Sequence, residues 1–126
     1  MKTSSTVYNS ELGGRIEITE SSQGCEVGGT LTQEFRPDPD TRHVLARFAE
    51  FPAQVAGGKS FDEAATNLLS IFNAYLELFV RENGIEVFKA RLEELGFSEG
   101  EDKESEPDGD SEWSMPITIP ALQLAC

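Results

Sequence analysis

Residues that commonly carry out chemistry are scarce in this sequence. Its 126 residues include two cysteines, Cys25 and Cys126, and one histidine, His43. Two thiols and one imidazole cannot complete the four-ligand shell of a structural zinc site, and we expect no disulfide between cysteines so far apart in the chain. His43 has no obvious catalytic neighbour in the sequence, and Cys25 precedes Glu26 rather than an activating basic group. We therefore predict a protein that is not an enzyme, with no catalytic residue, no metal and no cofactor.

Long apolar runs are also missing. The longest apolar stretch, residues 68–80, is interrupted by Ser70, Asn73 and Glu77, whereas a membrane-spanning helix needs about 20 apolar residues. The first 20 residues do not combine a basic segment with an apolar one, as a secretory signal does. We expect a cytoplasmic protein that makes no contact with a membrane.

Basic residues are few, and the acidic excess is uneven. The chain has 10 Lys+Arg against 23 Asp+Glu, a net charge of −13, which opposes direct binding to a nucleic-acid backbone. Residues 98–112 alone hold eight acidic residues against one lysine, and they include no apolar side chain. Such a segment cannot offset the entropy of its ordering by burial, so we predict an extended, solvated linker.

This acidic stretch supplies the candidate partner-binding residues. A lone tryptophan after a mobile linker is a typical anchor for a partner, although Trp113 docking the last strand onto the chain's own core is the interpretation we favour. The candidates are Glu99, Glu101, Asp102, Glu104, Asp108, Asp110, Glu112 and Trp113.

The strongest local signal is a helix start at residues 60–63 (SFDE). Ser60 is placed to accept from the amide of Glu63, while the Glu63 carboxylate reaches back to Ser60. Apolar residues then recur every three or four positions, which predicts a largely buried helix that ends at Asn83 and Gly84. The apolar positions are Phe61, Ala64 or Ala65, Leu68, Phe72, Tyr75 or Leu76, and Phe79.

A second, shorter helix follows the first. Ile85, Phe88, Leu92 and Leu95 keep the helical spacing, and Gly96 marks its end. The joint between the two helices is either a bend or a tight turn.

Before residue 60 the apolar pattern changes to a period of two. Residues 15–19, 26–35 and 43–51 read as strands, with a further short strand at 54–56. Residues 117–119 lie between two prolines, which restricts them to an edge or to a very short strand. We predict an α+β fold, in which a three- to four-stranded antiparallel sheet packs on one long helix, with a second short helix and a C-terminal edge strand. The predicted organisation is a domain at 1–97, the linker at 98–112 and a returning strand at 113–126.

Two motifs resemble ligand-binding loops. Residues 53–60 (AQVAGGKS) fit a loose phosphate-binding loop, with Lys59 and Ser60 in the places that contact phosphate and magnesium. The predicted sheet is antiparallel and Ser60 already serves as a helix cap, so we favour a plain strand-to-helix turn. Residues 104–112 alternate oxygen-bearing side chains as a calcium loop does, but the twelfth position, Met115, cannot supply the bidentate carboxylate.

Residues 43–80 resemble the HicB-type antitoxin domain. The resemblance lies in residues 48–52 (FAEFP), 55–64 (VAGGKSFDEA), 67–68 (NL) and 74–77 (AYLE). It implies a small α+β domain related to a degenerate ribonuclease H fold, with a last strand after the helix and no catalytic residues. Members of the family act by covering a small basic RNA-cleaving toxin, a partner that an acidic surface suits.

These observations favour a cytoplasmic, HicB-like binding protein that neutralises a basic protein partner, such as the antitoxin of a toxin-antitoxin system. The alternative is an acidic nucleic-acid mimic, such as a phage anti-defence inhibitor, that blocks a nucleic-acid-binding complex. In both cases the partner is a basic toxin or a nucleic-acid-handling protein. An exposed edge strand also predicts a homodimer.

Overall fold

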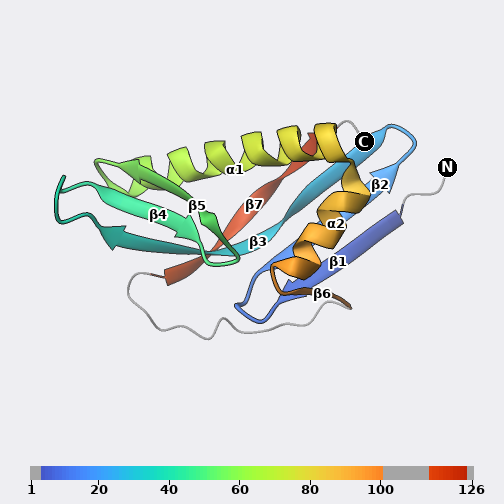
Figure 1. Cartoon of the computed structure of the whole chain (residues 1–126), viewed down its shortest axis with the longest axis horizontal. Helices are drawn as coiled ribbons and strands as arrows, with labels where there is room; N and C mark the ends of the chain where they lie inside the picture. The colour runs from blue at the N-terminus through green and yellow to red at the C-terminus, as the bar shows by residue number, and fades with distance from the viewer. Residues whose placement is uncertain (1–3, 101–113, 125–126) are drawn as a thin grey trace.

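The protein is an α+β structure in which two helices lie on one face of a curled antiparallel sheet (Figure 1). The computed structural model describes residues 4–100 and 114–124. The elements are β1 (Ser4–Ser10), β2 (Arg15–Ser21), β3 (Gly24–Pro37), β4 (Val44–Phe48), β5 (Phe51–Gly58), α1 (Phe61–Asn83), α2 (Ile85–Glu94), β6 (Phe97–Glu99) and β7 (Ser114–Leu124).

The sheet is organised around β3, its longest strand. Strands β2 and β4 both pair with β3 on one side, and β7 pairs with it along the other side. The pairing with β2 ends at Thr30, and that with β4 begins at Gln33. The two halves of the sheet, β2–β1–β6 and β4–β5, therefore separate on either side of Thr32 and form a fork.

A buried carboxylate fills this fork. Glu50, in the turn between β4 and β5, accepts a hydrogen bond at Oε1 from the amide of Thr32 at 2.8 Å. The carbonyl of Thr32 accepts from the amide of Ala49 at 2.9 Å. Gly14, in the turn between β1 and β2, lies against the Glu50 carboxyl so closely that a Cβ there would lie 2.6 Å from Cδ. Glu50 thus joins the two halves of the sheet at Thr32, a residue of β3 that is paired with neither β2 nor β4.

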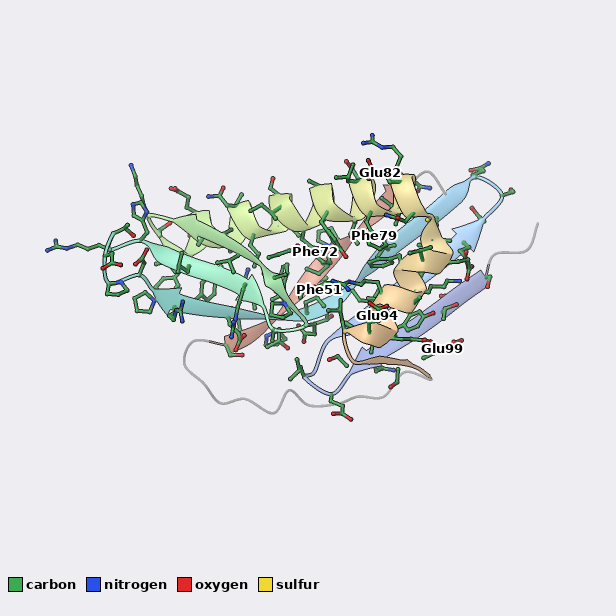
Figure 2. All side chains as sticks on the ribbon, viewed as in Figure 1. Phe51, Phe72, Phe79, Glu82, Glu94 and Glu99 are labelled. Carbon is green, nitrogen blue, oxygen red and sulfur yellow. The ribbon has the colours of Figure 1, made fainter. Side chains whose placement is uncertain are left out.

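Helix α1 begins and ends as the sequence predicts. The Ser60 hydroxyl accepts from the amide of Glu63 at 3.1 Å, and Gly84 ends the helix with a φ of 87°. Its buried residues recur every fourth position and pack on aromatic side chains of the sheet, with Phe51 and Phe72 5.0 Å apart between ring centroids (Figure 2). They are Ala64, Leu68, Phe72, Leu76 and Val80.

The prediction of a largely buried α1 is wrong. Phe61 is 47% exposed, Ile71 41% and Leu78 47%. A helix that covers one face of a single sheet buries one stripe only, because no second layer covers its outer side.

Helix α2 starts immediately after Gly84, so the joint between the helices is a sharp bend at one residue. Its buried residues Ile85, Phe88 and Leu92 face the sheet, as predicted from their spacing. Phe79 of α1 and Phe88 of α2 meet edge to face at 5.9 Å, which fixes the second helix against the first.

Within residues 4–100 and 114–124 the sheet has seven strands, whereas three or four and a C-terminal edge strand were predicted. Strands β1 and β6 were not predicted, because β1 (SSTVYNS) is mostly polar and β6 has three residues. Ser98 and Glu99, assigned to the linker from the sequence, belong to β6. The next residue of the proposed linker, Gly100, donates its amide hydrogen to the carbonyl of Val7 at 3.0 Å. Residues 101–112 lie outside the described residues.

Strand β7 is an edge strand, as predicted, but it extends over eleven residues. Pro116 lies opposite Thr32, whose backbone groups bond to Glu50 and Ala49 on the other side of β3. The backbone nitrogen of Pro116 therefore faces the open edge, where a proline cannot donate. This edge is poorly suited to pairing with a second copy, so the expected homodimer, which remains a prediction, requires another surface.

The prediction that the cysteines are unpaired is wrong, because Cys25 is disulfide-bonded. Cys25 of β3 lies opposite Leu124 of β7, so antiparallel pairing brings the end of the described chain beside it despite the long sequence separation. Cys126, the other cysteine of the sequence, lies outside the described residues.

The disulfide is expected to stabilise the fold. A disulfide typically contributes about 2–4 kcal/mol to stability, mainly by restricting the unfolded chain. We expect Cys25→Ser, or reduction of the wild type, to lower the thermal midpoint of unfolding by several degrees. Reducing agent should leave the Cys25→Ser variant unchanged. Equal midpoints for oxidised and reduced wild type, with the oxidised state verified by mass spectrometry, would contradict this expectation.

Candidate functional site

A pocket of about 340 Å³ lies between α2 and the outer strands β1 and β6. It forms because α2 crosses this end of the sheet, with side chains three or four positions apart on one face of the helix. We call it the Tyr8 pocket; its lining residues are Thr6 and Tyr8 of β1, Glu86, Lys89, Ala90 and Glu93 of α2, and Glu99 of β6.

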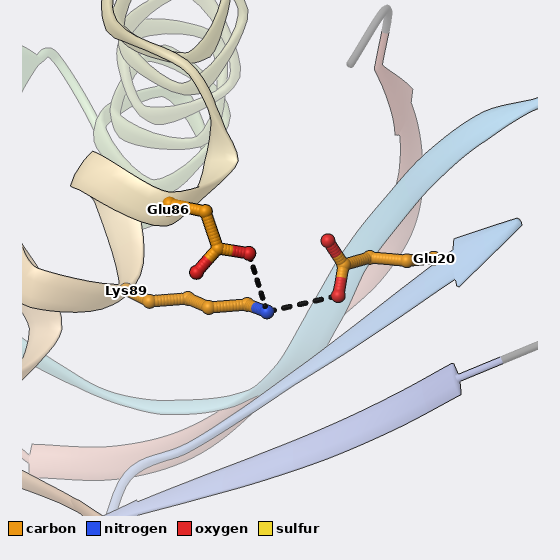
Figure 3. Close-up of polar contacts among 3 residues, drawn as sticks. All are labelled: Glu20, Glu86 and Lys89. Carbon is orange, nitrogen blue, oxygen red and sulfur yellow. Dashed lines mark hydrogen bonds and ion pairs between the residues drawn. The ribbon is translucent and has the colours of Figure 1, made fainter.

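Lys89 fixes α2 to the sheet beside this pocket. Its Nζ lies 2.8 Å from Oε2 of Glu20 on β2 and 3.2 Å from Oε1 of Glu86 (Figure 3). The hydrogen bond to Glu20 raises the pKa of Lys89 above its ordinary value, despite the opposing effect of burial. Lys89 is therefore a positive charge with two acidic partners, and the carboxylates of Glu93 and Glu99 are left without a basic partner in the pocket.

Tyr8 is the buried polar group of the pocket. Its side chain is 2% exposed, and no hydrogen bond joins its hydroxyl to another group within residues 4–100 and 114–124. The hydroxyl oxygen is not among the fully enclosed atoms that lack a partner, so its small exposed area opens into the pocket. Burial raises the pKa of the phenol, and the carboxylate of Glu99 raises it further, while Lys89 acts in the opposite direction. The phenol therefore stays neutral over the physiological range and keeps its lone pairs available as acceptors.

Glu50 is a buried carboxylic acid. It lies in the fork between the two halves of the sheet and not in a pocket. It is 1% exposed, and its Oε2 has no hydrogen-bond partner in the described part of the chain. Burial raises the pKa of its carboxyl above the ordinary value, although the amide of Thr32 lowers it. Its contacts are with backbone groups of the fold, which indicates a structural role.

A second hollow, of about 260 Å³, lies over β3, β4 and β5. Leu45 and Val55 supply apolar surface, and Arg36 and Arg47 border it. Because Nε of Arg47 is paired with Oε1 of Glu34 at 3.1 Å, this hollow offers less unbalanced charge than the Tyr8 pocket.

The structure explains the residues that resemble a phosphate-binding loop. Gly58 packs so closely on the first turn of α1 that a Cβ would lie 2.4 Å from the amide nitrogen of Ala64. The side-chain amide of Asn67 donates to the carbonyl of Gly57 at 2.9 Å. Strand β5 pairs antiparallel with β4, and Ser60 caps the helix. These contacts agree with the strand-to-helix turn favoured from the sequence.

Of the predicted partner-binding residues, the structure describes Glu99. It is the last residue of β6, lies opposite Tyr8 of β1 and lines the Tyr8 pocket. The other predicted residues lie outside the described ranges. They are Glu101, Asp102, Glu104, Asp108, Asp110, Glu112 and Trp113.

Sequence reasoning missed the other residues of the pocket. The spacing of Glu86, Lys89 and Glu93 in the sequence places them on one helix face. We interpreted that face as a solvated surface. Tyr8 was missed because its strand was not predicted.

In the described part of the chain, no three His, Cys, Asp or Glu side chains are grouped to hold a metal ion. None of its helices is both long and apolar enough to cross a membrane.

Comparisons with protein-family models, curated proteins and solved structures found no match for this chain.

Proposed function

We propose that this protein is a non-enzymatic, HicB-like binding protein that neutralises a small basic RNA-cleaving partner. The observation that carries the proposal is the unbalanced negative charge at the Tyr8 pocket. Glu86, Glu93 and Glu99 line the pocket together with Lys89, whose ammonium is already paired with Glu20 and Glu86. In the sequence, Glu99 leads directly into the acidic stretch that ends at residue 112.

Two further features support the proposal. The β4–β5–α1 unit contains the residues that resemble the HicB-type domain, and Gly58 and Asn67 have structural roles there that account for their place in the motif. An acidic surface also speeds association with a basic partner through electrostatic steering. A cytoplasmic location is part of the proposal, although the Cys25 disulfide is a bond that a reducing cytoplasm opens.

The first experiment captures the partner with the tagged, full-length protein from its native host. We expect a small basic protein that cleaves RNA when purified alone and stops cleaving when this chain is added in equal amount. Capture of no basic protein, or of one whose RNA cleavage is unaffected, would contradict the proposed function.

The second experiment neutralises the acidic pocket. The variant Glu86→Gln, Glu93→Gln, Glu99→Gln is expected to bind the captured partner at least about tenfold more weakly, with a smaller dependence of affinity on salt. Isothermal titration calorimetry at two salt concentrations measures both effects.

A matched control separates the pocket from net charge. The variant Glu11→Gln, Glu26→Gln, Asp40→Asn removes the same charge from exposed acids elsewhere, and we expect less than about a twofold loss. Equal losses in the two triple variants would show that net charge, rather than this pocket, governs binding.

The rival function, an acidic mimic of nucleic acid, is distinguished by competition. If the partner is a nucleic-acid-handling protein, short duplex DNA displaces this chain from it. Three of the described carboxylates share one pocket with Lys89, an arrangement unlike the evenly spaced charges of a nucleic-acid backbone, so we expect no displacement at physiological salt.

A further inference from the structure

The Tyr8 pocket has the features of a site for an organic cation. Three carboxylates, from Glu86, Glu93 and Glu99, line a space that holds the single ammonium of Lys89. Lys89 is 17% exposed and is bonded to both Glu20 and Glu86. Its ammonium is therefore anchored towards β2, and it does not balance the carboxylates on the side of β6.

Tyr8 is a second and independent indication of a ligand. A tyrosine buried to 2% exposure ordinarily finds a hydrogen-bond partner for its hydroxyl. The Tyr8 hydroxyl has none in the described part of the chain, and because it is not among the fully enclosed atoms without a partner, it opens into the pocket that Tyr8 lines. A donor that enters the pocket would complete its hydrogen bonding.

The shape of the site favours an extended, multidentate cation over a metal ion. The described carboxylates do not converge in a group of three that could hold a metal, and the pocket volume of about 340 Å³ is far larger than an ion. A guanidinium presents five N–H donors in a plane and bonds several acceptors at once. Its aliphatic stem would lie along Ala90, the small residue of the α2 wall.

We propose that the Tyr8 pocket receives an arginine side chain, whose guanidinium donates to the Tyr8 hydroxyl and to the carboxylates of Glu93 and Glu99. That the arginine belongs to a basic protein partner rests on the proposed function. The affinity of the pocket for an arginine side chain is independent of that function and can be measured without the partner.

The test is a titration of the full-length, isotope-labelled protein with N-acetyl-arginine methylamide, followed by NMR. We expect saturable shifts at the Tyr8 ring and at the amides of Lys89 and Ala90. The uncharged isostere N-acetyl-citrulline methylamide should cause no saturable shift, and the lysine analogue should bind several-fold more weakly. Magnesium chloride at equal ionic strength tests for a metal site and should give none of these shifts.

Two variants assign the contacts. Tyr8→Phe keeps the buried ring and removes only the hydroxyl, and we expect it to weaken arginine binding about fivefold. Glu93→Gln should weaken it by a similar factor, whereas Glu26→Gln, on an exposed position of β3, should not. The proposal is overturned by equal shifts with citrulline, by magnesium reproducing the arginine shifts, or by Tyr8→Phe and Glu93→Gln both binding as wild type.

Failure of this inference differs from failure of the proposed function. If the arginine analogue does not bind but the captured partner is still neutralised, the pocket assignment is wrong and the function stands. If the analogue binds in the pocket and no RNA-cleaving partner is captured, the pocket stands and the function is wrong.

Discussion

Gly29→Ala is expected to destabilise the protein by at least ~3 kcal/mol, one of the largest effects of any single substitution. Gly29 has a φ of 145°, and a Cβ at this position would lie 2.0 Å from the carbonyl oxygen of Arg15. It lies in β3 where both β2 and β7 are paired, at the irregularity in the β3–β7 register. Alanine would force β2 away from β3. Urea denaturation of the oxidised protein, followed by circular dichroism, measures the loss.

Gly57→Ala is the matched control. A Cβ at Gly57 meets Cδ2 of Leu45 at 3.6 Å, an ordinary van der Waals distance. We expect a change within about 1 kcal/mol. If Gly29→Ala is no more destabilising than Gly57→Ala, the close pairing of β2 and β7 with β3 around Gly29 is incorrect.

Glu50→Gln is expected to stabilise the protein increasingly as pH rises. The pKa of Glu50 is higher in the folded state than in the unfolded chain because of burial, so its protonated form favours folding. That contribution is fully present below the unfolded pKa, about 4.3, and is lost as pH rises through the folded pKa. Above that range the wild type holds a charge in the fork, whereas glutamine retains an acceptor for the Thr32 amide.

The measurement is the difference in free energy of unfolding between wild type and Glu50→Gln at several pH values. We expect the variant to gain stability relative to wild type between pH 4 and pH 8, because only the wild type has to ionise a buried carboxyl in this range. Glu34, the charged neighbour that also raises the pKa of Glu50, is kept in both proteins. Exposed Glu26→Gln is the control and should show no such trend. A difference that is independent of pH would contradict the raised pKa.

The helical half of the fold could be predicted from sequence because its signals are local. Ser60 and Gly84 mark the two ends of α1 within one turn each, and both were recognised. The spacing of Phe88 and Leu92 likewise identified the buried face of α2. What remained unpredicted was the exposed side of α1, which depends on how many layers the fold has.

The sheet and the pocket depend on contacts between distant segments. Tyr8 lies in a polar strand whose position is set by β2 and β6, and neither partner is apparent from its own sequence. The register between Cys25 and Leu124 similarly depends on the return of β7. Candidate binding residues were therefore sought in the acidic stretch, where composition alone indicates a charged surface. The pocket beside α2 was not predicted.

The central claim is that the face formed by α2, β1 and β6 binds the basic partner. Hydrogen–deuterium exchange of this chain, alone and in complex with the captured partner, tests it most directly. We predict slower exchange at Tyr8, at residues 86–93 and at Glu99 in the complex. Protection confined to β4 and β5, with unchanged exchange around α2, would contradict it.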